Sequence, residues 1–325
     1  MFQGGFFTKK KAVKMASYSF FIILLCLTPL FMGSYHIHLA ILVLIYIILT
    51  SSLRTIYISG QLSLGHAAFV GIGAYTSAIL AMRLDWTPWG TILLGGLAAM
   101  VAGILIGLPF SRLRAMYFTM ASLFLGIMIT SLIAVFPELT QSYTGLMSIP
   151  RLFGFPKEPY YYFFLVLALV TLLVLYRIEH SRVGMTFKAV AQSHLAAASI
   201  GISETRTRIL ALGIGCFFAG IAGAAYAHYS TFIAPTDFAL MPSIYLLVYL
   251  IVGGTGSFAG PIVGAIVLVL IPYLMGGFKG FAPFFLAGAL IIVIFIIPQG
   301  LISLPSRTKL WISKLREGGV SESAS

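Results

Sequence analysis

Long apolar segments separated by short polar ones dominate the pattern along this chain. About 20 residues are needed to cross the hydrocarbon core of a bilayer, so we interpret each apolar segment as a candidate membrane-spanning helix. Two segments, Leu39–Leu53 and Leu240–Val252, are short for a full crossing, and both run directly into glycine-rich stretches. The ten segments are Ser17–Gly33, Leu39–Leu53, His66–Met82, Pro88–Phe110, Met116–Phe136, Tyr160–Tyr176, Ile209–Thr231, Leu240–Val252, Gly260–Met275 and Phe281–Ile302.

Composition supports an all-α, polytopic membrane protein. Of the 325 residues, 60% are hydrophobic and only 9% are charged. A soluble domain carries roughly 25% charged residues, so this chain cannot cover itself with polar surface. The solvent for most of it must therefore be the lipid bilayer.

The basic residues indicate the orientation of the chain. With the N-terminus in the cytoplasm, alternating spans place 16 of the 20 lysines and arginines on the cytoplasmic side. Such asymmetry sets orientation during membrane insertion, and it explains the net charge of +12 without nucleic acid. We expect a cytoplasmic segment 1–16, a transmembrane domain 17–304 with a long cytoplasmic loop 177–208, and a cytoplasmic tail 305–325. The apolar run Tyr18–Met32 follows four lysines as in a signal peptide, but without a cleavage site, which predicts an uncleaved first span.

The first glycine-rich stretch, Gly60–Tyr75, has the sequence GQLSLGHAAFVGIGAY. Glycine destabilises a helix interior by about 1 kcal/mol relative to alanine. Within a bilayer, broken backbone is tolerated only where it is buried in protein or lines a wet cavity. We therefore predict that this stretch belongs to a solute pathway, with candidate residues Gly60, Gln61, Ser63, Gly65, His66, Gly71, Gly73 and Tyr75.

A second glycine-rich stretch, Gly253–Gly264, follows the other short span. Paired short spans that end in glycine or proline interruptions are typical of the substrate region of transporters. Its candidate pathway residues are Gly253, Gly254, Gly256 and Ser257. Gly254–Ala259 also matches a loose dinucleotide-binding pattern, but the soluble βαβ unit that such a site requires is missing.

The polar residues of the first stretch have two interpretations. Gln61, Ser63 and His66 can line the solute path with hydrogen-bonding groups, or they can satisfy broken backbone and bridge neighbouring helices. The glycines suit close helix approach better than ligand contact.

No acidic residue falls in the middle of a predicted span. Ion-coupled carriers generally mark their relay with intramembrane carboxylates or histidines, and only His66 and His228 lie in or near a span. No Walker A loop, catalytic constellation or metal-ligand motif occurs, which predicts a protein that is not an enzyme and has no cofactor. The energy source is then on another subunit.

The long cytoplasmic loop offers a place to receive that energy. It predicts a short helix, Met185–Ala198, with Phe187, Val190, Ala191 and His194–Leu195 on a mixed apolar face and with Lys188 and Gln192 facing away. Such a helix can dock into a partner or lie on lipid as an interfacial amphipathic helix. Periodicity does not separate these two alternatives.

Three stretches together resemble the LivM-type permease of branched-chain amino acid ABC importers. They are GQLSLGHAAFVGIGAY, the loop Arg182–Ile202 with its AAASIGI element, and LIVGGTGSFAGPIVGAIV. The resemblance covers roughly Leu39–Leu304.

The resemblance implies a permease in a bacterial or archaeal cell membrane that pairs with a homologous permease, two cytoplasmic ATPases and an extracytoplasmic substrate-binding protein. Transport of amino acids, above all leucine, isoleucine and valine, would proceed by alternating access. The loop would dock the ATPases through Arg182, Gly184, Lys188, His194, Ala196, Ala197 and Gly201. The alternatives are an ion-coupled secondary amino-acid carrier and a passive channel or structural subunit.

Overall fold

Helices make up nearly all of the described chain. The computed structural model describes residues 28–29, 33–113, 115–154, 156–274, 284–285, 287–288, 290–291, 295 and 300–303. The predicted spans Ser17–Gly33 and Phe281–Ile302 lie largely outside these residues, and segments 1–16 and 305–325 lie wholly outside them. The long helices are α2 (Ser34–Tyr57), α3 (His66–Arg83), α4 (Pro88–Phe110), α5 (Ala115–Val135), α7 (Glu158–Glu179), α10 (Glu204–Ser230), α11 (Leu240–Gly253) and α12 (Gly260–Leu274).

The expected all-helical, polytopic architecture is confirmed. Of the described helices, six are long and apolar enough to cross a membrane: α2, α4, α5, α7, α10, and η2 with α11 taken together. The helices α3 and α12 coincide with two further predicted segments. Both glycine-rich breaks are present, one between α2 and α3 and one between α11 and α12.

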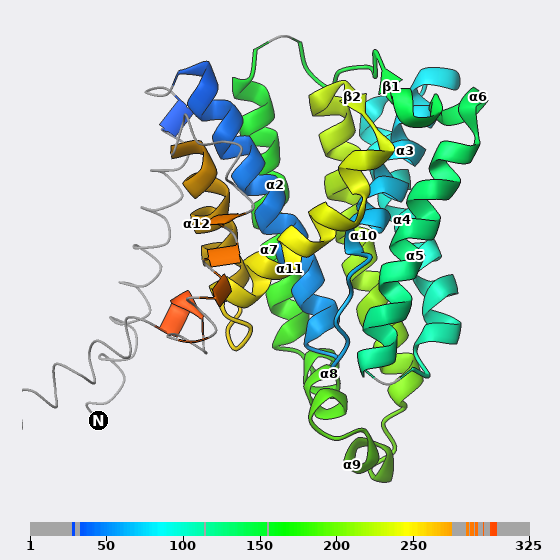
Figure 1. Ribbon diagram of the computed structural model, residues 1–325, viewed down its shortest axis with the longest axis vertical. Coiled ribbons are helices and arrows are strands. Elements are labelled where there is room, and N and C mark those ends of the chain that lie inside the picture. Colours follow the sequence, from blue (N-terminus) through cyan, green and yellow to red (C-terminus); the bar gives the residue numbers. More distant parts are fainter. Residues whose placement is uncertain are drawn as a thin grey trace, which may run out of the picture.

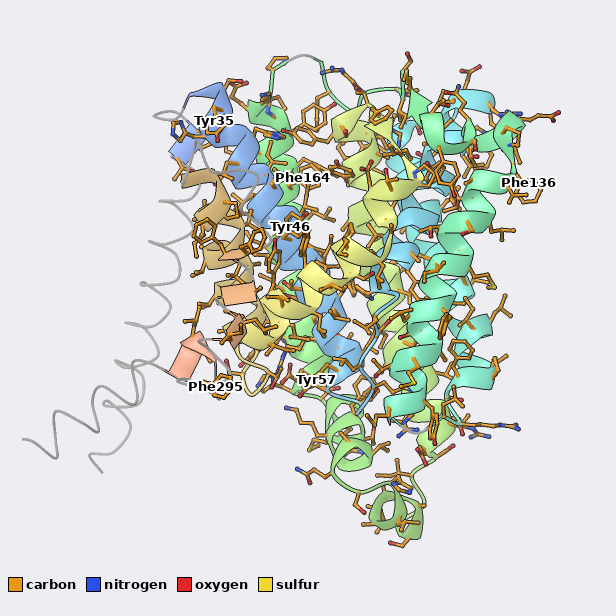
Figure 2. The ribbon with its side chains drawn as sticks, in the orientation of Figure 1. Tyr35, Tyr46, Tyr57, Phe136, Phe164 and Phe295 are labelled. Carbon is orange, nitrogen blue, oxygen red and sulfur yellow. The ribbon has the colours of Figure 1, made fainter. Side chains whose placement is uncertain are left out.

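Most of the long helices run roughly parallel between two structurally different ends, and α11 crosses the bundle obliquely (Figure 1). At the lower end of that view, α8 (Arg182–Gln192) and α9 (His194–Ser199) project beyond the bundle. At the upper end lie α6 (Pro137–Thr140), η1 (Ser142–Thr144), β1 (Leu146–Met147), β2 (Phe232–Ile233) and η2 (Pro235–Phe238). We call these the α8 end and the sheet end. Tyr35 lies near the sheet end of α2 and Tyr57 near its α8 end (Figure 2).

A two-stranded antiparallel sheet lies at the sheet end. β1 precedes α7, and β2 follows α10. Leu146 pairs with Ile233 and Met147 with Phe232. This pairing ties the loop before α7 to the segment before α11, so the two halves of the chain are joined at this end.

Small residues hold the centre of the bundle together. α10 packs against α2, α3 and α4. A Cβ atom placed on Gly73 of α3 would overlap the carbonyl oxygen of Gly220 in α10. Because lipid gives no hydrophobic drive for helix association, close packing of this kind is what joins membrane helices. Gly73 therefore contributes contact between backbones.

The single helix expected over Met185–Ala198 is wrong: two helices are present. Ser193 separates α8 from α9 because its backbone is extended, with φ −158°, and its hydroxyl accepts a hydrogen bond from the Ala196 amide at 3.3 Å. The break turns His194 and Leu195 to solvent, away from the apolar face of Phe187 and Val190. Ala191 is likewise exposed.

Candidate functional site

The first glycine break places α3 and α8 in contact with the end of α2. α2 ends at Tyr57, and α3 begins at His66. Gly60 lies between them with φ +83°, a conformation that favours glycine because it carries no Cβ atom. A Cβ atom on Gly60 would lie 3.1 Å from the Ala191 Cα atom, so α8 packs directly on this break.

A cavity of about 580 Å³ opens beside this break at the α8 end. We call it the α8 cavity. Its walls combine residues that the sequence assigned to two separate roles: Gly60, Gln61 and Gly256 from the predicted pathway and Lys188 from the predicted coupling loop. The other lining residues are Arg54, Tyr57, Ile58, Leu62, Met116, Thr119, Ala191, Gln192 and Thr255.

Above the α8 cavity lies a layer of small polar side chains. Ser51 and Ser52 come from α2, Gln61 and Ser63 from the first break, and His66 from the first turn of α3. We call these five residues the polar barrier. Each is at most 2% exposed, so all five side chains are buried inside the bundle.

Most of the polar barrier lacks hydrogen-bond partners among the described residues. Ser52 is satisfied, because its hydroxyl donates to the Leu49 carbonyl at 2.8 Å and also contacts His66 Nε2 at 2.8 Å. The atoms without a partner are Ser51 Oγ, both amide atoms of Gln61, Ser63 Oγ and His66 Nδ1. A buried polar group without a partner costs about 1–3 kcal/mol. These atoms can hydrogen-bond to a polar solute that passes this level.

A second cavity, of about 600 Å³, lies toward the sheet end. Six tyrosines dominate its lining, so we call it the tyrosine cavity: Tyr46, Tyr160, Tyr226, Tyr229, Tyr245 and Tyr249. Arg151, Lys157 and His38 also line it, and His38 Nδ1 lies 2.5 Å from the Tyr229 hydroxyl.

An adjoining space of about 280 Å³ shares Leu42, Tyr46, Tyr226 and Tyr245 with the tyrosine cavity. Aliphatic and aromatic side chains form most of its wall, so we call it the apolar lobe; Thr236 and Asp237 are its polar members besides the tyrosines. Leu49 of α2 lines the apolar lobe, and Arg54 lines the α8 cavity. Five residues of helix rise about 7.5 Å, so only a thin layer separates the two spaces along α2.

The remaining predicted residues of the first stretch make structural contacts. Side chains added to Gly65, Gly71 or Gly73 would overlap or crowd Ser122, Phe238 and Gly220 respectively. The Tyr75 hydroxyl is buried and donates to the Ile233 carbonyl at 3.5 Å. These four residues do not line the three cavities described above.

The second break is shaped by its backbone. Gly254 has φ +111°, and a Cβ atom on Gly253 would overlap the Gly260 carbonyl oxygen. Gly256 lines the α8 cavity, and a Cβ atom added to it would meet no atom within 4 Å. The Ser257 hydroxyl is buried and lacks a partner within the described part of the chain. Of the four predicted residues, only Gly256 lines one of the three cavities.

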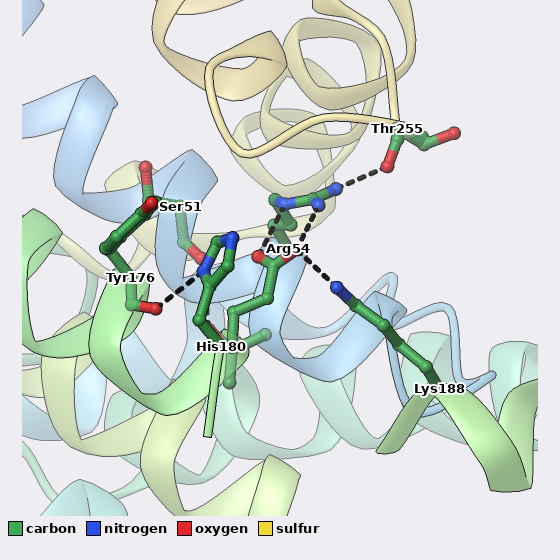
Figure 3. A network of polar contacts seen from close by, with 8 residues as sticks. Ser51, Arg54, Tyr176, His180, Lys188 and Thr255 are labelled. Carbon is green, nitrogen blue, oxygen red and sulfur yellow. Dashed lines mark hydrogen bonds and ion pairs between the residues drawn. The ribbon is translucent and has the colours of Figure 1, made fainter. Parts of the chain in front are cut away.

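A buried ion cluster forms one wall of the α8 cavity (Figure 3). Arg54 donates from Nη2 to Glu179 Oε1 at 2.8 Å and from Nε to Glu179 Oε2 at 3.3 Å. Lys188 Nζ lies 3.1 Å from the same Oε1 atom. Arg54 also donates to the Thr255 carbonyl, in the second glycine break. We call Arg54, Glu179, Lys188 and Thr255 the ion cluster.

The predicted coupling residues take different positions. A side chain on Gly184 would overlap the Glu179 carbonyl, so α8 starts tightly against the end of α7. Lys188 is exposed, unlike the apolar residues Phe187 and Val190 of the same helix, and its ammonium group also contacts Glu179. Arg182, His194, Ala196 and Gly201 are exposed, and Ala197 is buried.

Two central residues of this site were missed from the sequence. Arg54 follows the second predicted span, Glu179 falls in the predicted cytoplasmic loop 177–208, and neither was given a role. They lie 125 residues apart, and their pairing becomes visible only in three dimensions. The one available sequence signal was that both are charges placed within a few residues of a span end.

Comparison with known proteins identifies the family. The pattern of the family described as "Branched-chain amino acid transport system / permease component" matches residues 35–297. A high-affinity branched-chain amino acid transport system permease protein LivM from Salmonella typhimurium is 30% identical over 319 residues, covering 89% of this chain and 74% of the relative. The Escherichia coli protein of the same name is 30% identical over 311 residues, covering 87% and 72%. No solved structure gave a significant match.

The chain therefore belongs to this family of permease components. It is a multi-pass membrane protein, and it is not an enzyme.

Proposed function

We propose that this chain is a membrane-spanning subunit of an ATP-binding-cassette importer that moves amino acids by alternating access. Family membership and the names of the two relatives support this function. The observation that carries it is the polar barrier. Its side chains are buried, most of them have polar atoms without partners among the described residues, and they follow in sequence between residues that line the apolar lobe and residues that line the α8 cavity. A carrier needs such a layer, closed at rest and polar enough to be crossed by a hydrated solute.

The cavities support leucine, isoleucine and valine as the leading substrates. Arg151 and Lys157 supply positive charge in the tyrosine cavity for a carboxylate. The apolar lobe next to it offers Ile45, Val70 and Leu246 to an aliphatic side chain. In our proposal the solute enters at the sheet end, crosses at Gln61, Ser63 and His66, and leaves through the α8 cavity.

The proposed orientation places the α8 end in the cytoplasm of a bacterial or archaeal cell, in the inner membrane, with both termini cytoplasmic. Basic residues gather at that end of the described helices: Arg54, Arg112, Arg177, Arg182, Lys188, Arg206 and Arg208. Arg83, Arg151 and Lys157 lie at the sheet end. The excess at the α8 end agrees with the positive-inside rule.

We propose that α8 and α9 dock on an ATPase partner. The apolar face of α8 is already used within the protein, because Phe187 is fully buried and packs with Ile58 and Ala211. This packing argues against α8 as a helix that lies on lipid. Leu195 and Ile200, each 73% exposed, remain on the projecting part as apolar groups for a partner.

The full assembly would contain a homologous permease, two ATP-binding subunits and an extracytoplasmic substrate-binding protein. The test is uptake of labelled leucine by vesicles that contain all these subunits. We expect uptake to require ATP and the binding protein together. Accumulation of leucine by the purified chain alone under an ion gradient would overturn this function and favour an ion-coupled carrier.

A further inference from the structure

We propose that Glu179 is a positioning residue that couples movement of α8, through Arg54, to the second glycine break. This inference rests on the proposed function, in which α8 receives the movement of an ATPase. Glu179 is the last residue of α7, is only 7% exposed, and accepts from cations on two other elements. Its carboxylate therefore joins α2, α7 and α8.

The link to the second break passes through Arg54. Its guanidinium makes a two-pronged contact with Glu179 and still donates to the Thr255 carbonyl. Arg54 is 3% exposed, so water competes little for these bonds. A planar, five-donor guanidinium can hold a carboxylate and a backbone carbonyl at once in a fixed geometry, which a lysine in its place cannot reproduce.

The link to α8 passes through Lys188. Its side chain is 47% exposed, so it lies at the surface of the cluster, and its ammonium group contacts the Glu179 oxygen that also accepts from Arg54. In Figure 3 the Arg54 guanidinium reaches toward Thr255, and the Lys188 side chain approaches the same cluster from α8. A shift of α8 therefore changes the charge around Glu179 and the hold of Arg54 on the second break.

The link to the first break is direct. Ala191 of α8 lies against Gly60, and Phe187 of α8 packs with Ile58 at the end of α2. The same shift of α8 thus reaches Gly60 and its neighbour Gln61 by contact. Because Arg54, Lys188, Gly60 and Thr255 all line the α8 cavity, movement of α8 alters the opening on this side of the polar barrier.

The experiment measures how many leucine molecules are transported for each ATP hydrolysed, in vesicles that contain the complete assembly. The variants are Glu179→Gln, Lys188→Gln and the two combined. The matched control is Arg177→Gln, which removes an exposed cation two residues from Glu179 on the same helix. Recovery of ATPase subunits with each variant after purification is measured alongside.

We expect Glu179→Gln to lower the number of leucine molecules per ATP by about fivefold, the lower end of typical coupling between sites. Lys188→Gln should have a smaller effect, and the combined variant should be no worse than Glu179→Gln, because both act through one contact. ATPase recovery should stay at the wild-type level, and Arg177→Gln should transport as wild type.

A wild-type number of leucine molecules per ATP in the assembled Glu179→Gln variant would overturn the inference. Fully additive effects in the combined variant would also overturn it. If Glu179→Gln does not assemble, the test rests on Lys188→Gln, because this variant leaves the Arg54–Glu179 pair in place. A wild-type number of leucine molecules per ATP in Lys188→Gln would then overturn the inference. Failure of the proposed function itself appears differently, as a wild-type assembly without any ATP-dependent uptake.

Discussion

The two glycine breaks look alike in sequence and are used differently in the structure. The first break places Gln61 and Ser63, both 1% exposed, among buried polar groups that have no partner within the part of the chain that the structure describes. The second break brings backbones together, since Gly253 lies against the Gly260 carbonyl and the Thr255 carbonyl is held by Arg54. One break presents buried polar side chains, and the other brings backbone segments together and is held at Thr255 by the distant Arg54 side chain.

The difference shows that glycine density alone does not locate a binding surface. Glycine marks places where backbone must turn or approach closely. Whether such a place contacts solute depends on the polar side chains between the glycines and on whether those side chains reach a cavity. In the first break Gln61 reaches the α8 cavity, although Ser63 and His66, like Ser257 of the second break, line none of the three cavities described above.

The largest effect is expected from Gly253→Val in the second break. The new side chain would overlap the Gly260 backbone, and overpacking of this kind costs about 1–3 kcal/mol, occasionally more. We expect a marked loss of thermal stability in detergent and little monodisperse protein. Gly256→Ala is the control, because nothing lies within 4 Å of the added atom. Normal stability of Gly253→Val would contradict the tight-backbone description of this break.

The next largest effect is expected from Gln61→Leu in the first break, and it should fall on transport. The substitution removes two buried polar atoms without partners, so the free energy of unfolding should stay constant or rise. Loss of a solute hydrogen bond of about 1–1.5 kcal/mol should slow ATP-driven uptake about tenfold. The measurement pairs uptake rates with thermal unfolding of the same preparation. Wild-type uptake would show that Gln61 does not contact the solute.

A moderate effect is expected from Gly60→Ala. The positive φ of Gly60 costs an alanine about 1–2 kcal/mol, and the added atom would sit 3.1 Å from Ala191. We expect lower stability, together with fewer leucine molecules transported per ATP, because the contact with α8 is disturbed. Unchanged stability would mean that this turn is not held in the left-handed conformation.

The smallest effect is expected from Ser257→Ala in the second break. The hydroxyl has no partner within the described residues and faces none of the three cavities, so stability should change by less than about 0.5 kcal/mol. Uptake should match wild type. A loss of uptake as large as that of Gln61→Leu would erase the distinction between the two breaks.

Much of the fold follows from the sequence, because lipid imposes simple rules on backbone. Most spans and both breaks were predicted from apolar length and glycine position, and α2, α3, α11 and α12 end or begin at those breaks. The expectation that Leu39–Leu53 is short for a full crossing is wrong, because α2 continues at both ends over Ser34–Tyr57 and is long enough to span the bilayer. The division of the coupling loop into α8 and α9 was not predicted. Ser193 caps the second helix there, but a lone serine within a helical pattern is compatible with either outcome.

Several residues of the site were predicted individually, but their arrangement in space was not. Composition drew attention to Gln61, Ser63 and His66, but their burial without partners depends on helix packing. Likewise, Lys188 was assigned to an ATPase contact, and its bond to Glu179 depends on the ends of α7 and α8 meeting. Pairings across 125 residues leave no trace in local periodicity, so the junction of pathway and coupling loop required coordinates.

The central claim is that the polar barrier opens to solute during turnover. Its most direct test is modification of Ser63→Cys by a small thiol reagent in the reconstituted assembly, with Cys26 and Cys216 replaced. Ser63 is 1% exposed, so we predict no labelling at rest, labelling when ATP and loaded binding protein drive transport, and slower labelling as leucine concentration rises. A cysteine that stays unlabelled during measured leucine uptake would contradict the account.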